Sequence, residues 1–194
     1  MSKQSAPVGV YHPGNDPNIR QHSGICGGSN TDRFDIWVVH AYGGRLFVDG
    51  AHGAHLPFLG LTPFAGADGV VVSAHKTLPA LGQAALLFTN GIDPDRVRRM
   101  ASVFGTSSPS YSILASMDAA RAWLEGDGAR AYRQTALRVA QLRSRFPSLA
   151  GDLSLDPARL TLNVQDGPSF ARSLEEQNIF PEMEDGGHVV FICT

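Results

Sequence analysis

Polar side chains that could do chemistry follow two apolar runs of the sequence. Asp49 and His52 come after the first run, and Ser73, His75 and Lys76 come after the second. If both runs are parallel strands of one sheet, their carboxyl ends meet at one edge, which is where open α/β sheets bind ligands. The sequence therefore predicts a crevice that combines a carboxylate, imidazoles, a hydroxyl group and an amine.

Lys76 has the most specific chemistry of this set. Of the 16 basic residues, all except Lys3 and Lys76 are arginine. A lysine in a partly buried crevice has its charged form disfavoured, so its amine can attack a carbonyl and form a Schiff base. An aspartate opposite a pyridine nitrogen keeps that nitrogen protonated and makes the ring an electron sink. With Ser73 and His75 available for a phosphate, the set indicates a pyridoxal phosphate site.

Three sequence motifs support this interpretation. They are DGAHGAHLPF at 49–58, SAHKTLPALGQ at 73–83 and FGTSSPSYSILASMDAAR at 104–121. Together they resemble the Orn/Lys/Arg decarboxylase family of fold-type I pyridoxal phosphate enzymes. The resemblance extends from about Gly24 to the C-terminus.

The resemblance implies a role for each residue of the motifs. Lys76 would be the lysine that holds the cofactor as a Schiff base, and Asp49 would pair with the pyridine nitrogen. Ala51 would pack against the cofactor ring, and His52 would lie near its phenolic oxygen. The implied cofactor-binding set is Asp49, Ala51, His52, Ser73, His75 and Lys76.

The same resemblance implies the reaction. A basic amino acid, either lysine, ornithine or arginine, would replace Lys76 on the cofactor and lose its α-carboxylate as CO2, giving a polyamine or diamine. Ser73 and His75 would contact the cofactor phosphate. Family members are usually dimers or larger homo-oligomers, so a partner copy is implied as well.

Members of this family are considerably longer than 194 residues. The resemblance implies a fragment that lacks the N-terminal half of the large domain and part of the C-terminal domain. We expect a loop or disordered lead-in at 1–30, a partial cofactor-binding large domain at 31–147 and the start of a small α/β domain at 148–194. A truncated, non-catalytic relative or interaction protein is therefore an alternative function.

A zinc site is another interpretation of these polar side chains, because carboxylates and imidazoles are zinc ligands. The candidate ligands are Asp49, His52, His55 and His75. His52 and His55 are three residues apart, a spacing that can place both side chains on one face of a helix. However, Gly53 and Pro57 disfavour a regular helix there, and a metal leaves Lys76 unexplained. His55 is better interpreted as a structural residue.

The pattern of apolar residues predicts an α/β fold with a mainly parallel sheet. The runs at 45–49 and 69–73 predict strands in the middle of a sheet that is covered on both faces. Asp93 and Pro94 predict the start of a helix. The expected helices are 32–40, 94–104, 112–124, 128–146 and 168–178, and two further strands are expected at 159–164 and 188–193.

Composition narrows the class of protein further. A net charge of -2 argues against a protein that binds nucleic acid or an anionic membrane, since both need a concentrated basic surface. No apolar run approaches the roughly 18 residues of a membrane span. Cys26 and Cys193 give neither a disulfide framework nor a CxxC motif, so we expect two reduced thiols in a cytoplasmic protein.

Overall fold

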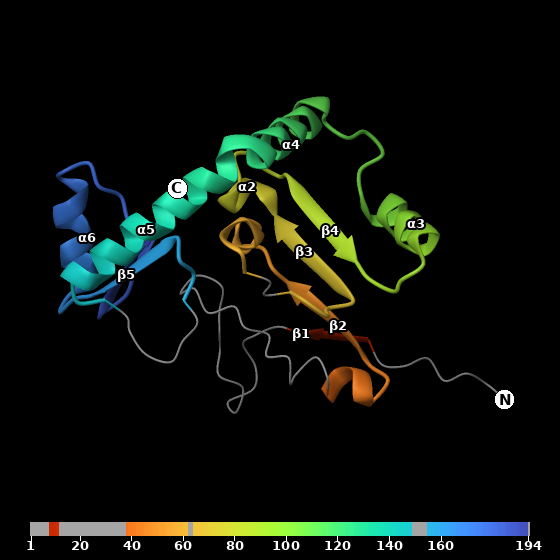
Figure 1. Cartoon of the computed structure of the whole chain (residues 1–194), viewed down its shortest axis with the longest axis horizontal. Coiled ribbons are helices and arrows are strands. Elements are labelled where there is room, and N and C mark those ends of the chain that lie inside the picture. Colours follow the sequence, from red (N-terminus) through yellow and green to blue (C-terminus); the bar gives the residue numbers. More distant parts are fainter. Residues whose placement is uncertain (1–7, 12–37, 62–63, 149–154, 194) are drawn as a thin grey trace. The chain divides into compact units, whose positions relative to one another are not determined.

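The computed structural model describes residues 8–11, 38–61, 64–148 and 155–193 (Figure 1). Contacts divide these residues into two compact units. The first unit holds 8–11, 38–55 and 64–123, and the second holds 56–61, 124–148 and 155–193. The expected boundary at 147 and 148 refers to the domains of the longer relatives and stays a prediction.

The first unit contains a four-stranded sheet in the order β1-β2-β3-β4. Its strands are β1 (Val8–Tyr11), β2 (Arg45–Asp49), β3 (Gly69–Ser73) and β4 (Ala85–Thr89). The first three strands are parallel, and β4 runs antiparallel to β3. The expectation of a mainly parallel sheet is therefore confirmed, and both predicted strands of this unit have the expected bounds.

Neither β1 nor β4 is among the expected strands. β1 lies inside the segment 1–30, so the expectation of a loop is wrong for these four residues, and the rest of that segment lies outside the described part of the chain. β4 has the sequence ALLFT, an apolar run of the same length and kind as β2 and β3, although no strand is expected there. β1 depends on pairing with β2, which a local pattern does not contain.

One face of this sheet forms the core of the first unit. Leu46, Val70 and Val72 are buried there among the small side chains of the following loops. On the opposite face, Val71 and Leu87 are register partners and are 43% and 54% exposed. The expectation that both faces are covered is therefore wrong within the described chain.

The helices of the first unit are residues 38–41, α2 (Ala74–Thr77), α3 (Pro94–Phe104) and α4 (Tyr111–Trp123). Of these helices, α3 and α4 begin and end close to the expected positions, whereas no helix is expected at the position of α2. The Asp93 side chain accepts a hydrogen bond from the Asp95 amide at 3.0 Å, so the expected N-cap of α3 is confirmed. Only the end of the helix expected at 32–40 falls within the described residues, and Gly43, with φ of 70°, follows it.

The second unit has a smaller antiparallel sheet in the order β5-β7-β6. Its elements are η1 (Leu56–Leu59), η2 (Leu124–Gly128), α5 (Ala129–Arg145), β5 (Arg159–Asn163), α6 (Gly167–Glu175), β6 (Met183–Glu184) and β7 (His188–Ile192). The sequence predicts α5, β5, α6 and β7 but not the two-residue strand β6. No described helix is both long and apolar enough to cross a membrane.

The apolar stripe of helix α5 is only partly buried within the second unit. The stripe consists of Tyr132, Ala136, Val139, Leu142 and Phe146. Tyr132 and Val139 are buried, and the Tyr132 ring stacks on Phe58 with the ring centroids 6.4 Å apart. Leu142 and Phe146, from the same predicted stripe, are 36% and 50% exposed. The stripe is therefore buried at Tyr132 and Val139 and exposed near the carboxyl end of the helix.

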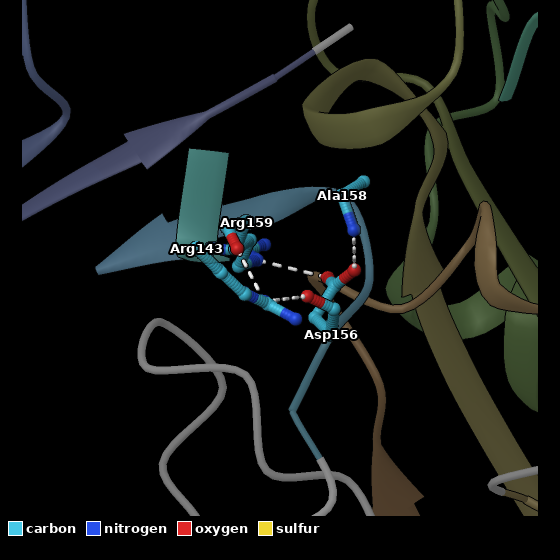
Figure 2. Close-up of polar contacts among 4 residues, drawn as sticks. All are labelled: Arg143, Asp156, Ala158 and Arg159. Carbon is cyan, nitrogen blue, oxygen red and sulfur yellow. Dashed lines mark hydrogen bonds and ion pairs between the residues drawn. The ribbon is translucent and has the colours of Figure 1, made fainter. Parts of the chain in front are cut away.

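A buried ion pair lies at the start of β5, and Arg143 of α5 is hydrogen-bonded to the backbone of the same segment (Figure 2). Asp156 accepts from Arg159 Nε at 3.0 Å and from the Ala158 amide at 2.9 Å, and the two charged side chains are 5% and 2% exposed. Arg143 of α5 donates to the backbone carbonyls of Asp156 and Arg159. Burial lowers the pKa of the Arg143 guanidinium. Cys193 is a free thiol. Burial raises the pKa of this thiol, and the Arg143 charge acts in the opposite direction.

We predict that Asp156→Ala lowers the free energy of unfolding by about 3–5 kcal/mol, because it leaves the Arg159 charge buried without its carboxylate. Urea unfolding followed by circular dichroism measures this change. The matched control is Asp127→Ala, which breaks the exposed i,i+3 pair with Arg130 and should cost less than about 1 kcal/mol. Equal losses in both variants would contradict the prediction.

The hydrogen bonds of Asp68 make the stability of the first unit depend on pH. Burial alone would raise the pKa of Asp68, but hydrogen bonds from the Leu46 amide and the His40 ring, both 2.8 Å long, leave it lowered overall. A lowered carboxyl pKa stabilises the fold above the ordinary value of 3.8, and this stability is lost as pH falls through the folded-state pKa. We therefore expect Asp68→Asn to destabilise the protein at pH 6 and to differ less from the wild type at pH 3. Urea midpoints at both pH values test this, and a pH-independent difference would refute it.

Candidate active site

The pairing of β2 with β3 brings the two predicted groups of polar residues together. Asp49, the last residue of β2, lies opposite Val71 in β3. Beyond β2, the Gly50 amide donates to the Val71 carbonyl at 2.8 Å, and the Ser73 amide donates to the Ala51 carbonyl at 3.2 Å. The loop after β2 is thus hydrogen-bonded to the carboxyl end of β3, as the parallel arrangement predicts.

Lys76 lies in the short helix α2 directly after β3. Two residues of this helix, Ala74 and Thr77, are buried, so the turn is anchored while His75 and Lys76 remain exposed. Lys76 Nζ lies 3.2 Å from Nε2 of His52, a residue 24 positions earlier in the chain. The two nitrogens are within hydrogen-bonding distance, so the sheet edge brings the amine and an imidazole together.

Asp49 is exposed at the end of β2, and its carboxylate has a fixed orientation. Its Oδ1 accepts a hydrogen bond from the Ala51 amide at 3.0 Å, which forms a tight side-chain turn over two residues. Ala51 and His52 are half-buried beside it. The carboxylate therefore stays at the sheet edge as an accessible negative charge.

His75 is oriented by the loop that follows α2. Its Nδ1 lies 2.9 Å from the Ala84 carbonyl, which can only accept, so Nδ1 carries a proton. Ser73 is half-buried at the end of β3. Both predicted phosphate contacts therefore precede Lys76, by three residues and by one, at the carboxyl end of β3.

Two residues that the sequence pattern does not indicate shape the loop after α2. Ser116 of α4 accepts from the Leu81 amide at 3.1 Å and donates to the Ile113 carbonyl at 2.7 Å, which ties α4 to the loop after Lys76. Gln83 has a φ of 72°, a conformation that residues other than glycine rarely adopt. Ser116 belongs to the third motif, so the motif contained the signal, whereas nothing local marks the strain at Gln83.

Gly50 occupies a position with no room for a side chain. A Cβ there would lie 2.7 Å from Cζ of Phe64 and 3.2 Å from Cγ1 of Val70. The absence of a side chain lets the loop after β2 pack directly on the core and carry Ala51 and His52 toward Lys76.

The structure does not assemble the alternative zinc site. Within the described residues, no three Asp, Glu, His or Cys side chains are close enough together to hold a metal ion. His55, one of the four candidate ligands, is buried in the first unit. Its burial agrees with the interpretation of His55 as a structural residue.

The donor set matches the groups of pyridoxal phosphate. The cofactor has an aldehyde, a ring nitrogen and a phosphate, which call for an amine, an anionic carboxylate and polar or cationic groups. Lys76 supplies the amine, Asp49 the carboxylate, and Ser73 and His75 the polar groups. All four lie at the carboxyl ends of two adjacent parallel strands.

Comparisons with curated proteins give a consistent set of relatives. The chain is 36% identical over 177 residues to the uncharacterized protein YaaO of Bacillus subtilis (strain 168). It is 30% identical over 183 residues to the arginine decarboxylase of the same organism. These matches cover 81% and 82% of this chain but 37% of each relative, so the chain spans little more than a third of their length.

Solved structures show the same fold. The constitutive lysine decarboxylase of Escherichia coli matches 88% of this chain with a TM-score of 0.67 and 21% sequence identity. The match covers 32% of that chain. The lysine decarboxylase LdcF of Francisella novicida matches 77% of this chain with a TM-score of 0.57, again at 21% identity. The expected fold class, a partial fold-type I large domain with a further α/β segment, is confirmed.

The family model for the major domain of Orn/Lys/Arg decarboxylases matches residues 27–170. This stretch contains all three motifs and every predicted site residue. The chain belongs to the Orn/Lys/Arg decarboxylase family.

Proposed function

We propose that this chain takes part in the pyridoxal phosphate-dependent decarboxylation of a basic amino acid, either lysine, ornithine or arginine. The observation that carries the proposal is the 3.2 Å contact between Lys76 Nζ and His52 Nε2, at the sheet edge that Asp49 also occupies. Family membership supports it, as do relatives named arginine decarboxylase. We also propose the cytoplasmic, homo-oligomeric state that is usual in the family.

Each residue of the site has a distinct task in this proposal. Bound pyridoxal phosphate supplies the electron sink that accepts the electron pair left when CO2 departs. Lys76 Nζ would hold the cofactor through its aldehyde carbon, and the Asp49 carboxylate would keep the ring nitrogen protonated. His52 Nε2 orients the Lys76 amine, since it lies within hydrogen-bonding distance of Nζ.

The phosphate contact requires a particular protonation state of His75. Nδ1 already points its proton at the Ala84 carbonyl. Donation to a phosphate therefore needs a second proton on Nε2, so His75 acts there as an imidazolium. Ser73, two residues before His75, adds a hydroxyl donor.

A non-catalytic relative is the second candidate function. The observation in its favour is that the chain spans 37% of the length of the arginine decarboxylase it matches. CO2 release distinguishes the two candidates. The purified chain with pyridoxal phosphate and lysine, arginine or ornithine should release CO2 if it is a decarboxylase, and cofactor binding without CO2 release would favour the non-catalytic relative.

We predict that borohydride reduction of the chain with pyridoxal phosphate attaches a pyridoxyl group to Lys76. Peptide mass spectrometry locates the adduct, because Lys3 is the chain's other lysine and serves as an internal control. Lys76→Ala should remove the adduct, and also the visible absorbance that the Schiff base gives before reduction. An adduct on Lys3 alone, or an equal yield from Lys76→Ala, would refute the assignment of Lys76.

We predict that Asp49→Asn weakens pyridoxal phosphate binding by about 10- to 100-fold, since one hydrogen bond to a charged group contributes about 1.5–3 kcal/mol. Asparagine keeps the oxygen that accepts from the Ala51 amide, so the local turn should survive. Titration monitored by cofactor absorbance measures the affinity. The matched control is Asp118→Asn on α4, where the exposed aspartate pairs with Arg121. Unchanged affinity in Asp49→Asn would contradict the role of the carboxylate.

A further inference from the structure

The loop between α2 and β4 ends in a tight turn whose conformation its sequence disfavours. The Ala84 amide donates to the Leu81 carbonyl at 3.2 Å, which closes a turn of four residues. Gln83, the third residue of this turn, has a φ of 72°, a value that glycine or asparagine usually supplies at that position. Glutamine there costs free energy, so contacts outside the turn must hold its conformation.

Ser116 of α4 supplies such a contact at the first residue of the turn. Its hydroxyl donates to the Ile113 carbonyl of its own helix at 2.7 Å. Because the hydroxyl proton is used there, the oxygen acts toward the loop only as an acceptor, and it accepts from the Leu81 amide at 3.1 Å. The turn is thus fixed by a side chain that lies 35 positions further along the sequence.

The last residue of the turn continues the connection to His75. The Ala84 carbonyl lies 2.9 Å from His75 Nδ1 and also accepts from the His75 amide at 3.4 Å. Ala84 is 1% exposed, and the next residue, Ala85, is the register partner of Ser73. The position of this carbonyl therefore depends on the turn on one side and on the sheet on the other.

We propose that Ser116 is a positioning residue for His75. A chain of hydrogen bonds runs from the Ser116 hydroxyl through the backbone of Leu81 and Ala84 to His75 Nδ1. By fixing the Ala84 carbonyl, Ser116 keeps the ring proton on Nδ1 and leaves Nε2 as the nitrogen that binds a phosphate oxygen. The phosphate contact rests on the proposed function, whereas the effect on the His75 ring does not.

The first test measures the protonation of the His75 ring nitrogens by heteronuclear NMR. It uses the chain without cofactor, at an alkaline pH where imidazole rings are neutral. The variant His75→Gln identifies the His75 signals among those of the seven histidines. We expect the proton on Nδ1 in the wild-type chain and a mixture of both tautomers in Ser116→Ala. Alanine favours a helix, so α4 should persist in this variant.

Two further variants separate the positioning role from a general effect on the fold. Ser116→Thr keeps a hydroxyl and should give the wild-type His75 signals. Ser102→Ala is the matched control, because the Ser102 hydroxyl of α3 makes the same contact with a carbonyl three residues earlier, that of Arg99 at 2.8 Å. An unchanged His75 ring in Ser116→Ala, or an equal change in Ser102→Ala, would overturn the proposal.

The second test compares two ligands that differ only in the phosphate. Ser116→Ala should weaken the binding of pyridoxal phosphate by about 2- to 10-fold, the effect of roughly one hydrogen bond, and leave the affinity for pyridoxal unchanged. Equal weakening for both ligands would contradict a role at the phosphate. If Lys76 forms no adduct with the cofactor, the proposed function fails, and the NMR measurement still decides whether Ser116 positions His75.

Discussion

Parallel pairing between β2 and β3 is the interaction on which the candidate site depends. It sets Asp49 opposite Val71 and extends past the strand ends through hydrogen bonds from the Gly50 and Ser73 amides. Side chains alternate between the faces of a sheet, so a shift of one residue would turn Asp49 into the apolar core and expose a valine in its place. The register is fixed because Val70 and Val72 must be buried on the opposite face.

Support for the reactive side chains comes from residues that do no chemistry themselves. Ala74 and Thr77 anchor α2 by burial, and Ser116 holds the loop after it to α4. Exposed Lys76 and His52 can meet because the backbone beneath them is fixed. The second unit is held together in a different way. Asp156 and Arg159 form a buried pair at the start of β5, and Arg143 of α5 donates to the backbone carbonyls of both residues, which couples α5 to the smaller sheet.

Much of the fold could be predicted from the sequence. The runs at 45–49 and 69–73 gave strands with the expected bounds, and Asp93 with Pro94 marked the start of α3. Strong local signals of this kind survive in the structure because burial and capping act over a few residues. β1 and β6, with four and two residues, contain too short a pattern to predict a strand, whereas β4 is an apolar run as long as β2 and β3 and could have been predicted in the same way.

The sequence by itself determined which side chains are available at the candidate site and in what order, because residue types, motif order and the lysine at position 76 are properties of the chain alone. Tertiary structure decided which of those residues meet. His52 and Lys76 are 24 positions apart, and only the sheet brings their side chains within 3.2 Å. It also decided that, within the described residues, one face of the sheet is open at Val71 and Leu87, although the run that contains Val71 predicts a strand covered on both faces. A local pattern records how apolar a strand is, whereas its burial depends on which other segments of polypeptide pack against it.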